Sequence, residues 1–249
     1  MQRLEGLMRK AIQEYGMIAP GDRVCVGVSG GKDSVALTVG LARLREYLGI
    51  PFEVVAVSLD PQFGNVPTDY SPLEQLFAEY NVEYHIRRSE IGHVVFDLRQ
   101  EKNPCALCAK MRRGLLHNTA KELGCNRVAL GHHLDDAVET FYMNLWGEGR
   151  LGCFSPVTWL SRKELYLIRP MVLATEAEVR RAVRELDLPV VKSACPADGA
   201  TRRQEMKDYV AAMAKKDPAF RQKMLGALQD AGLDGWAPLP GTESRRTRR

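Results

Sequence analysis

The 249-residue sequence lacks several features that would assign it to a familiar class. No apolar run approaches the ~20 residues that a helix needs to span a bilayer. The stretch 1–18 mixes acids with bases and has the pattern of an amphipathic helix, not of a signal peptide. We therefore expect a cytoplasmic protein, in which the six cysteines stay reduced and are poor candidates for structural disulfides.

The sequence also lacks the partners that common cysteine sites require. Cys105 and Cys108 form a C-x-x-C pair, but no second such pair and no pair of histidines at zinc-finger spacing accompanies it. A closed zinc site commonly needs four ligands of that kind. A thioredoxin-like redox pair would need a motif placement that this chain does not have.

Most of the chain also lacks a strong excess of positive or negative charge. The net charge is +4, but residues 242–249 hold four arginines and one glutamate, so the remainder is at about +1. The protein is therefore not globally basic, and any nucleic-acid surface must be local. We expect the arginine-rich tail to be a solvated end; a flexible arm that touches phosphates is the alternative.

Short apolar runs alternate with helical patterns along the chain, which predicts an α/β fold with a parallel sheet. Strands are expected at 23–29, 52–60, 83–90 (nearer an edge), 126–132 and 164–170, with a strand or extended segment at 189–196. Helices are expected at 34–49, 72–81, 106–124, 134–149 and 175–188, the last capped by Thr175, with loops at 91–104 and 147–158. We expect an N-terminal helix at 1–20, a nucleotide-binding domain at 21–200 and a helical C-terminal extension at 201–249, interrupted near Pro218.

A glycine-containing loop joins the first predicted strand to the first helix of the domain and reads S-G-G-K-D-S. It matches neither the Walker loop nor G-x-G-x-x-G. Its glycines allow a tight turn that exposes backbone N–H groups, and the following helix directs its positive end to the same place. We therefore predict a phosphate or pyrophosphate site, in preference to a plain helix cap. Its members are Ser29, Gly30, Gly31, Lys32, Asp33 and Ser34.

A group of carboxylates follows the fourth predicted strand, in the stretch G-H-H-L-D-D-A-V-E-T. Asp135 and Asp136 each lie three or four residues before Glu139, so the three carboxylates share one region of a helix. The end of a strand in an open α/β sheet is where ligands bind, and carboxylate oxygens suit Mg²⁺ that enters with ATP. Stabilisation of the helix N-terminus is the alternative. We expect His132 to contact nucleotide or to orient a carboxylate.

The six cysteines divide into two groups. Those with structural explanations are Cys25, Cys125 and, less clearly, Cys153. Cys105, Cys108 and Cys195 lie at the start of a helix and the end of a predicted strand. Three thiolates would leave one iron of a [4Fe–4S] cluster open to sulfide or substrate sulfur. Three unrelated buried cysteines are the alternative, and Cys153 competes with Cys195 for the third position.

The phosphate loop resembles the PP-loop of N-type ATP pyrophosphatases, which split ATP into AMP and pyrophosphate and adenylate a carbonyl oxygen. This resemblance implies a Rossmann-like sheet, with nucleoside contacts at Val57, Ser58 and Asp60. Together with C-x-x-C-x-x-x-R-R-G, the carboxylate stretch, L-I-R-P-M-V and Cys195, the loop is similar to the TtcA family of tRNA 2-thiocytidine synthetases over residues 5–215.

The family resemblance implies a function for these residues. Cys105, Cys108 and Cys195 would hold an oxygen-sensitive [4Fe–4S] cluster, and a cytidine at position 32 of tRNA would be thiolated. Related 2-thiouridine thiolases carry terminal zinc modules, which this sequence lacks, so the cytidine branch is favoured. The target base would flip out of a single-stranded loop.

The cations have expected roles in the same reaction. Lys32, Arg112 and Arg113 would stabilise phosphate charge, while Asp135 and Asp136, with Glu139, would hold Mg²⁺ in catalysis. The residues expected to grip the tRNA backbone are Arg112, Arg113, Arg202, Arg203 and Lys207. A solvated helix face is an equal alternative for the last three.

Two other functions remain open from the sequence. A cluster-free PP-loop enzyme could carry a persulfide on Cys105 or Cys195 and pass sulfur to tRNA uridine or to a small acceptor. A non-catalytic nucleotide-binding redox sensor is the second alternative. An amidotransferase or a lysidine-type ligase would not explain three placed cysteines. The expected partners are tRNA and an unidentified sulfur donor (sulfide or a cysteine desulfurase), with a homodimer as the candidate assembly and no membrane.

Overall fold

A computed structural model describes residues 1–99, 104–191, 195 and 202–242. Within these residues, one six-stranded sheet has the order β3-β2-β1-β4-β6-β5. The strands are β1 (Asp22–Val28), β2 (Phe52–Asp60), β3 (Glu83–Arg88), β4 (Arg127–Ala129), β5 (Val157–Leu160) and β6 (Leu165–Ile168). All neighbouring pairs are parallel except β5 with β6, which confirms the predicted α/β class and the edge position of β3.

The helices of the described chain surround this sheet. They are α1 (Gln2–Glu14), α2 (Lys32–Leu44), α3 (Ser71–Glu79), α4 (Ile91–His93), α5 (Pro104–Glu122), α6 (Leu134–Glu148), α7 (Glu176–Glu185), α8 (Arg202–Lys216) and α9 (Phe220–Asp230). Short 3₁₀ or π turns lie at Phe63–Asn65, Val94–Leu98 and Leu233–Gly235. No helix in the described residues is both long and apolar enough to cross a membrane.

The alternation of side chains along the strands produces two apolar cores. In β1 and β2, one set of buried residues, including Cys25, Val55 and Val57, packs with Leu116 of α5. The alternate set, including Val26, belongs to the larger core, which takes in α1, α2, α6 and α7. Successive strand residues point to opposite faces, so a nearly continuous apolar strand is buried on both.

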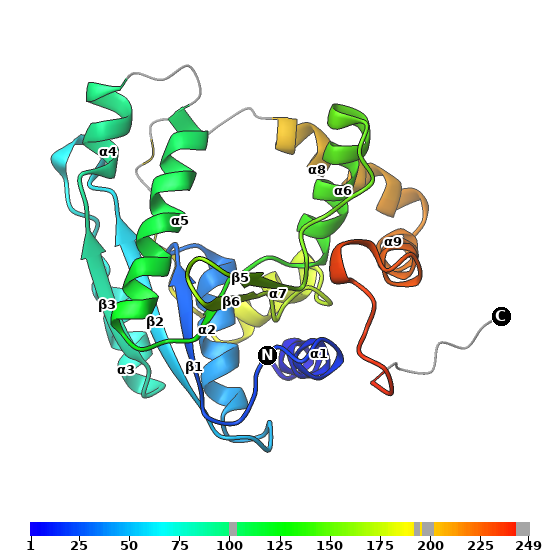
Figure 1. Ribbon diagram of the computed structural model, residues 1–249, viewed down its shortest axis with the longest axis horizontal. Helices are drawn as coiled ribbons and strands as arrows, with labels where there is room; N and C mark the ends of the chain where they lie inside the picture. Colours follow the sequence, from blue (N-terminus) through cyan, green and yellow to red (C-terminus); the bar gives the residue numbers. More distant parts are fainter. Residues whose placement is uncertain (100–103, 192–194, 196–201, 243–249) are drawn as a thin grey trace.

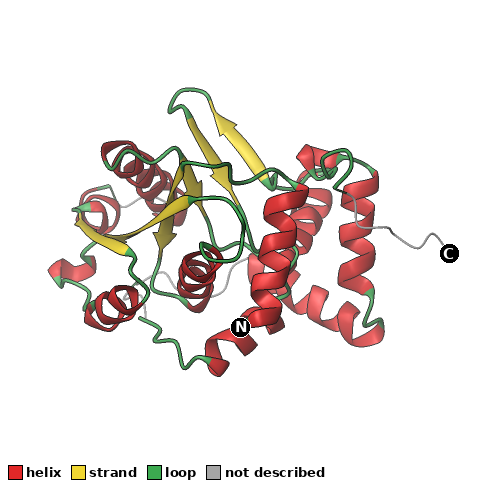
Figure 2. Cartoon of the chain, turned by 90° about the horizontal axis from the view of Figure 1, so that it is seen from below, coloured by secondary structure: helices red, strands yellow, loops and turns green. Residues whose placement is uncertain are grey.

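The C-terminal helices are packed against α6. Figure 1 shows α6, α8 and α9 together at the opposite end of the molecule from β3 and α4. Figure 2 shows the strands on one side of the molecule and helices without strands on the side that carries the C-terminus. The three-part domain division from the sequence stays a prediction.

Three segments differ from the sequence expectations. The predicted loop at 147–158 ends in β5, which forms because Val157–Leu160 pairs antiparallel with β6 in a hairpin. The predicted loop at 91–104 contains α4 and the π turn Val94–Leu98, which buries Ile91 and Val95. Residues 189–191 form no strand, and the rest of the expected segment at 189–196 lies outside the described residues except Cys195. The arginine-rich tail also lies outside them.

The predicted N-cap of α7 is confirmed. The Oγ1 atom of Thr175 accepts a hydrogen bond from the Glu178 backbone N–H at 3.3 Å, and the Glu178 carboxylate accepts one from the Thr175 N–H at 2.8 Å. This capping box fixes the start of the helix whose first residue reaches the phosphate loop.

Replacing Thr175 with alanine removes the oxygen that caps α7. We expect the Thr175→Ala variant to lose about 1 kcal/mol of unfolding free energy in urea denaturation. The Thr175→Ser variant keeps the hydroxyl and should lose much less. Equal losses in both variants would show that the methyl group, not the cap, carries the stability.

Candidate active site

The phosphate loop is built by its own backbone and two serines. Helix α2 begins at Lys32, two residues earlier than predicted, and Gly31 occupies the N-cap position. The Ser34 Oγ atom accepts a hydrogen bond from the Ser29 N–H at 3.1 Å and donates to the Gly31 carbonyl at 2.9 Å. Gly30 has φ +86°, a conformation that L side chains rarely adopt. The predicted loop geometry for a phosphate site is therefore present.

A second segment of the chain lies directly on this loop. The Val191 backbone N–H donates a hydrogen bond to the Gly30 carbonyl at 3.0 Å. A Cβ atom on Gly30 would lie 2.9 Å from the Val191 carbonyl oxygen, so only glycine permits this approach. Val191 therefore lies against the phosphate loop, four residues before Cys195 in the sequence.

The carboxylate stretch approaches the loop from the other side. A Cβ atom on Gly131 would lie 3.1 Å from the Asp33 carbonyl carbon and 3.2 Å from the Ser34 nitrogen. The turn between β4 and α6 therefore presses against the start of α2. The positive ends of α2 and α6 face one region, which favours the binding of an anion there.

Lys32 of the loop is held by two carboxylates. Its Nζ atom lies 3.0 Å from Asp33 Oδ2 and 3.1 Å from Glu176 Oε1. Burial opposes the charge, but Asp33 and Glu176 outweigh it and raise the pKa of Lys32. The lysine is therefore charged and oriented before any ligand binds.

Glu176 is a site residue that the sequence analysis missed. Its Oε1 atom also lies 3.2 Å from Lys207 Nζ and 2.9 Å from Arg180 Nη2. Burial opposes its charge, but hydrogen bonds from these cations lower the pKa of Glu176 to about 2. The available signal was the T-E-A-E capping box, which places Glu176 in the first turn of a helix.

Asp135 joins three elements at the base of the site. Its Oδ2 atom accepts a hydrogen bond from the Glu176 N–H at 2.7 Å, and its Oδ1 atom pairs with Arg221 of α9. The side chain is only 5% exposed, so both oxygens are engaged within the protein. Asp135 thus positions α7 and α9 relative to α6, and its assignment to Mg²⁺ stays a prediction.

Asp136 and Glu139 face Arg203 of α8. Asp136 Oδ2 accepts from the His133 N–H at 2.9 Å, and its Oδ1 pairs with Arg203, whose Nε lies 3.7 Å from Glu139 Oε2. Burial, with the charge of Asp136, raises the pKa of Glu139 to about 7. Arg203 and Lys207, considered for the tRNA backbone, instead contact protein carboxylates here. The side chain of Arg202 lies outside the described residues.

One carboxylate oxygen near the loop accepts no hydrogen bond from the described residues, although His133 Nε2 lies 3.9 Å from it. The Asp33 Oδ1 atom is buried and has no hydrogen-bond partner within the described structure. An unpaired buried oxygen of this kind is costly unless a ligand or cation reaches it. Asp33 therefore has an oxygen available for a metal that enters with a nucleotide.

A cavity of about 360 Å³ adjoins the loop at the carboxyl edge of the sheet. The apolar part of its wall includes Val57 and Leu130, and its polar residues include Ser29 and His132. Burial, then Arg169, lowers the pKa of His132 to about 4, so its imidazole is neutral. The cations that line the cavity are Arg112 and Arg113 of α5. The cavity gathers predicted nucleotide contacts and predicted phosphate-binding cations in one place.

The other two expected nucleoside contacts are engaged elsewhere. The Ser58 Oγ accepts a hydrogen bond from the Tyr84 hydroxyl at 2.7 Å. The Asp60 carboxylate accepts hydrogen bonds from the backbone N–H groups of Thr68 and Gln62, and both Ser58 and Asp60 are fully buried. Asp60 therefore organises the loop after β2, and a nucleoside contact for either residue stays a prediction.

The structure brings the three predicted cluster cysteines into one neighbourhood. Burial raises the pKa of the Cys108 thiol, Arg112 acts in the opposite direction, and nearby Cys195 and Cys105 raise it further. Such an effect requires the thiols to be close in space. Cys105 is exposed, Cys108 is buried and Cys195 is half-buried. Cys195, which comes ten residues after the end of α7 at Glu185, thus joins a pair that lies about ninety residues earlier.

The remaining cysteines lie in the apolar cores. Cys25 and Cys125 are buried together against α5. Cys153 is buried in the larger core, its thiol donates to the Ala137 carbonyl at 3.3 Å, and burial raises its pKa to about 12. These surroundings favour Cys195 over Cys153 as the third member of the cysteine group.

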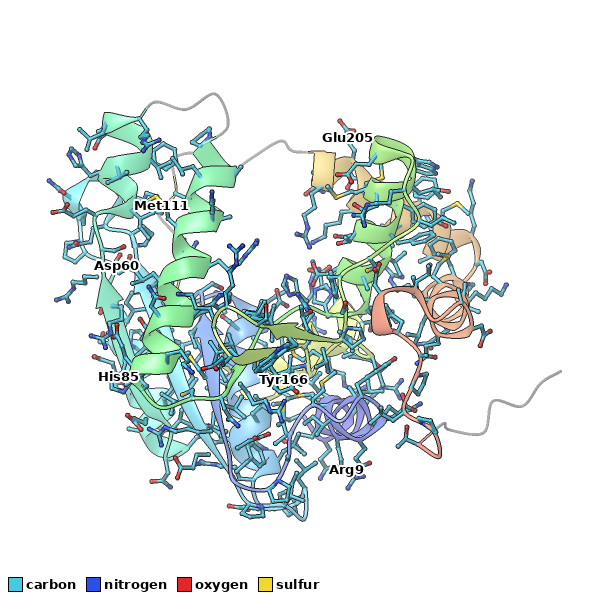
Figure 3. The ribbon with its side chains drawn as sticks, in the orientation of Figure 1. Arg9, Asp60, His85, Met111, Tyr166 and Glu205 are labelled. Atoms are coloured by element: carbon cyan, nitrogen blue, oxygen red, sulfur yellow. The ribbon has the colours of Figure 1, made fainter. Side chains whose placement is uncertain are left out.

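Figure 3 shows how cations enter the site from both sides. The labelled Met111 marks α5 and the labelled Glu205 marks α8, and nitrogen-bearing side chains extend from both helices toward the space between them. Helices α5 and α8 therefore lie on opposite sides of this space and both direct cations into it.

This arrangement defines the class of protein. The family model described as the PP-loop domain matches residues 3–212, which is most of the chain, so the chain belongs to the PP-loop family. Within that family it belongs with the tRNA-cytidine(32) 2-sulfurtransferases, because relatives with this name exceed 30% identity over most of both sequences. The resemblance to the tRNA 2-thiocytidine synthetases is thereby confirmed.

Two relatives and one solved structure illustrate this similarity. The tRNA-cytidine(32) 2-sulfurtransferase of Syntrophotalea carbinolica is 38% identical over 230 residues, 91% of this chain and 88% of that one. The protein of the same name from Geobacter sulfurreducens is 34% identical over 230 residues, 91% of this chain and 89% of its own. The solved U34-tRNA thiolase NcsA from Methanococcus maripaludis with its [4Fe-4S] cluster has a TM-score of 0.74 at 23% identity, covers 92% of this chain and 78% of that chain, and supports the fold.

The contact between Lys32 and Glu176 predicts a pH-dependent effect on ATP turnover. The Glu176→Gln variant loses the charge that raises the pKa of Lys32, so we expect the alkaline limb of the rate profile for AMP formation to move to lower pH. Because Lys32 also loses its orientation, kcat should fall roughly ten- to a hundredfold while KM for ATP changes less.

Glu178 provides the matched control, since it lies two residues away on the same helix and serves the capping box. The Glu178→Gln variant should lower thermal stability without moving the alkaline limb. If both variants lose stability and leave the pH profile unchanged, Glu176 has a structural role only.

Proposed function

We propose that this protein is an enzyme that thiolates tRNA with ATP, replacing the C2 oxygen of a cytidine, at position 32, with sulfur. The single observation that supports this most strongly is the closeness of two sites. The segment that leads to Cys195 rests on the phosphate loop through Val191, and Cys195 itself lies near Cys108. A group activated by ATP and a sulfur held by cysteines would therefore meet at one edge of the sheet.

The cysteine group is proposed to hold an iron–sulfur cluster and not a single metal ion. Among the described residues, no three His, Cys, Asp or Glu side chains are arranged to hold one ion. A cluster of four irons binds each thiolate on a different iron, so its ligands are farther apart than those of one ion. We propose Cys105, Cys108 and Cys195 as the ligands of a [4Fe–4S] cluster, which when bound would supply an open iron for sulfur.

Several residues of the chain would then act in the adenylation of the cytidine. The amides of Gly30 and Gly31 and the charge of Lys32 bind the ATP phosphates at the start of α2. Attack of the C2 carbonyl oxygen on the α-phosphate expels pyrophosphate, and the adenylate makes that oxygen a good leaving group. Arg112 and Arg113 stabilise the phosphate charge from the α5 side. The neutral His132 on the cavity wall contacts the nucleotide.

Mg²⁺ is proposed to accompany ATP. The open Oδ1 of Asp33 is one ligand oxygen for it. Asp136 and Glu139 contribute further oxygens when Arg203 releases them, and Asp135 when Arg221 does. Hard oxygen donors of this kind suit Mg²⁺ bound to phosphates.

The surroundings of the reaction complete the proposal. We place the protein in the cytoplasm, where tRNA and reduced thiols are found. Sulfide or a cysteine desulfurase supplies the sulfur, and a homodimer is the proposed assembly.

Replacing Cys195 tests the proposed division between the two sites. We expect anaerobically purified Cys195→Ala protein to lose the brown cluster absorbance and at least about a hundredfold of thiolation activity, while it still binds ATP, because its phosphate loop is intact. The matched control is Cys153→Ala, which should keep iron, sulfide and activity although it loses stability.

Two results would contradict this proposal. Iron-free, colourless wild-type protein with full thiolation activity would instead favour a persulfide on Cys105 or Cys195. Protein that forms no AMP from ATP with any tRNA would favour a nucleotide-binding redox sensor.

A further inference from the structure

The cations near the cavity and the carboxylates of α6 and α7 fall into two groups according to their partners, and of these cations Arg112 and Arg113 line the cavity itself. Those on α8 and α9 are neutralised, because Arg203, Lys207 and Arg221 each contact a carboxylate of α6 or α7. The other group consists of Arg112, Arg113 and Arg169. Within the part of the chain that the structure describes, none of these three has a carboxylate at ion-pair distance. The uncompensated positive charge therefore lies on the α5 and β6 side.

Arg169, just after β6, is the buried member of this group. It is only 7% exposed, and its guanidinium carbon lies 4.8 Å from the centre of the Phe154 ring. One of its terminal nitrogens, Nη1, donates to the Ser155 carbonyl, while Nε is buried without any described partner. A guanidinium carries five N–H donors and a fixed charge, so burial with a single neutral acceptor is costly.

Arg127, a buried arginine with a purely structural role, provides a comparison. Arg127 in β4 is also largely buried, 11% exposed at the side chain, and lies 4.2 Å above the Tyr166 ring. Its Nε, however, is 2.7 Å from Asp22 Oδ2, a buried carboxylate. Arg169 has the same stacking contact without the carboxylate. Tyr166, labelled in Figure 3, lies near the start of β6, whereas Arg169 follows its end at the site.

The neighbours of Arg169 connect it to the cavity. The Phe154 ring that it covers is also 5.0 Å from the ring of His132, which lines the cavity together with Arg113. The Nδ1 atom of His132 is likewise buried and has no described partner. Burial lowers the pKa of Arg169 to about 10, Cys153 acts in the opposite direction, and nearby Arg113 lowers it further. No anion of the described chain offsets this pair of arginines.

We propose that Arg169, which contacts the cavity lining through Phe154 and His132, is a phosphate-binding residue that acts with Arg113 of the lining to take one phosphate group of the substrate. The proposal rests on the function proposed above. A guanidinium binds a phosphate with two parallel hydrogen bonds, which would satisfy Nε and the remaining terminal donors at once. The phosphate has two sources, the adenylate formed from ATP and the phosphodiester backbone of tRNA, and both present the same oxygens.

The test compares three arginine variants of the full, anaerobically purified protein. The probes are AMP and an unmodified tRNA transcript whose loop contains the target cytidine, with the tRNA affinity measured across a series of salt concentrations. We expect Arg169→Gln and Arg113→Gln to weaken binding of one probe about ten- to a hundredfold. The Arg169→Lys variant keeps the charge but loses the planar guanidinium. It should therefore bind the same probe more tightly than Arg169→Gln and more weakly than the wild-type protein.

The two probes distinguish the source of the phosphate. If the tRNA affinity falls and its salt slope decreases by about one, the arginines bind the tRNA backbone. If AMP binding falls while the tRNA salt slope is unchanged, they bind the adenylate phosphate. The matched control Arg127→Gln removes a buried, stacked arginine away from the site, and should lower thermal stability without weakening either probe.

The inference and the proposed function fail in different ways. If wild-type protein binds both probes, and Arg169→Gln and Arg113→Gln bind them equally well, then Arg169 only supports Phe154 and Ser155, and the inference is wrong. The exposed Arg113 keeps this outcome measurable even where Arg169→Gln folds poorly. If wild-type protein binds neither probe, the proposed function fails, and the inference fails with it.

Discussion

The hydrogen bond from Val191 to Gly30 is the constraint on which the rest of the site depends. It joins two backbones, so its geometry is set by the chain path and not by a side chain that can rotate. Gly30 makes it possible, since any Cβ there would collide with the Val191 carbonyl. Through this contact the phosphate loop holds Val191, four residues before Cys195, and a reaction that uses ATP and sulfur at one atom needs such closeness. Gly131 gives the same loop a second close neighbour, from the carboxylate stretch.

Ion pairs then attach the C-terminal helices to the site. Arg221 and Arg203 bring α9 and α8 to the carboxylates of α6, while Glu176 binds Lys32 of the loop and Lys207 of α8 at once. A buried carboxylate such as Asp135 would be costly alone, so these cations are needed whenever no metal is bound. As a result Arg203, Lys207 and Arg221 are paired with carboxylates, while Arg112 and Arg113 of α5 have no carboxylate partner within the described residues, which gives an anionic substrate a direction of approach.

Local chemistry explains what the sequence could predict. The alternation of apolar runs with helical patterns indicated the parallel sheet, and the S-G-G-K-D-S loop with its flanking strand indicated the phosphate site. Thr175 was recognisable as a cap because its capping partner is three residues away. Glu176, Arg169 and the Gly30–Val191 contact were not predictable, because each role depends on residues far away in the chain. The antiparallel β5 was missed because Val157–Leu160 is short and follows a glycine- and proline-containing loop. Asp135 shows the limit of motif reading, since its oxygens serve Arg221 and the Glu176 backbone.

We propose that one protein uses ATP to activate a tRNA cytidine and inserts sulfur at the same base. The most direct measurement is mass spectrometry of tRNA nucleosides from cells that lack the protein, with the wild-type chain or the Cys108→Ala variant restored. We expect 2-thiocytidine to disappear in the deletion strain, to return with the wild-type chain and to stay absent with the variant. Loss of 2-thiouridine alone, or an unchanged nucleoside profile, would contradict it.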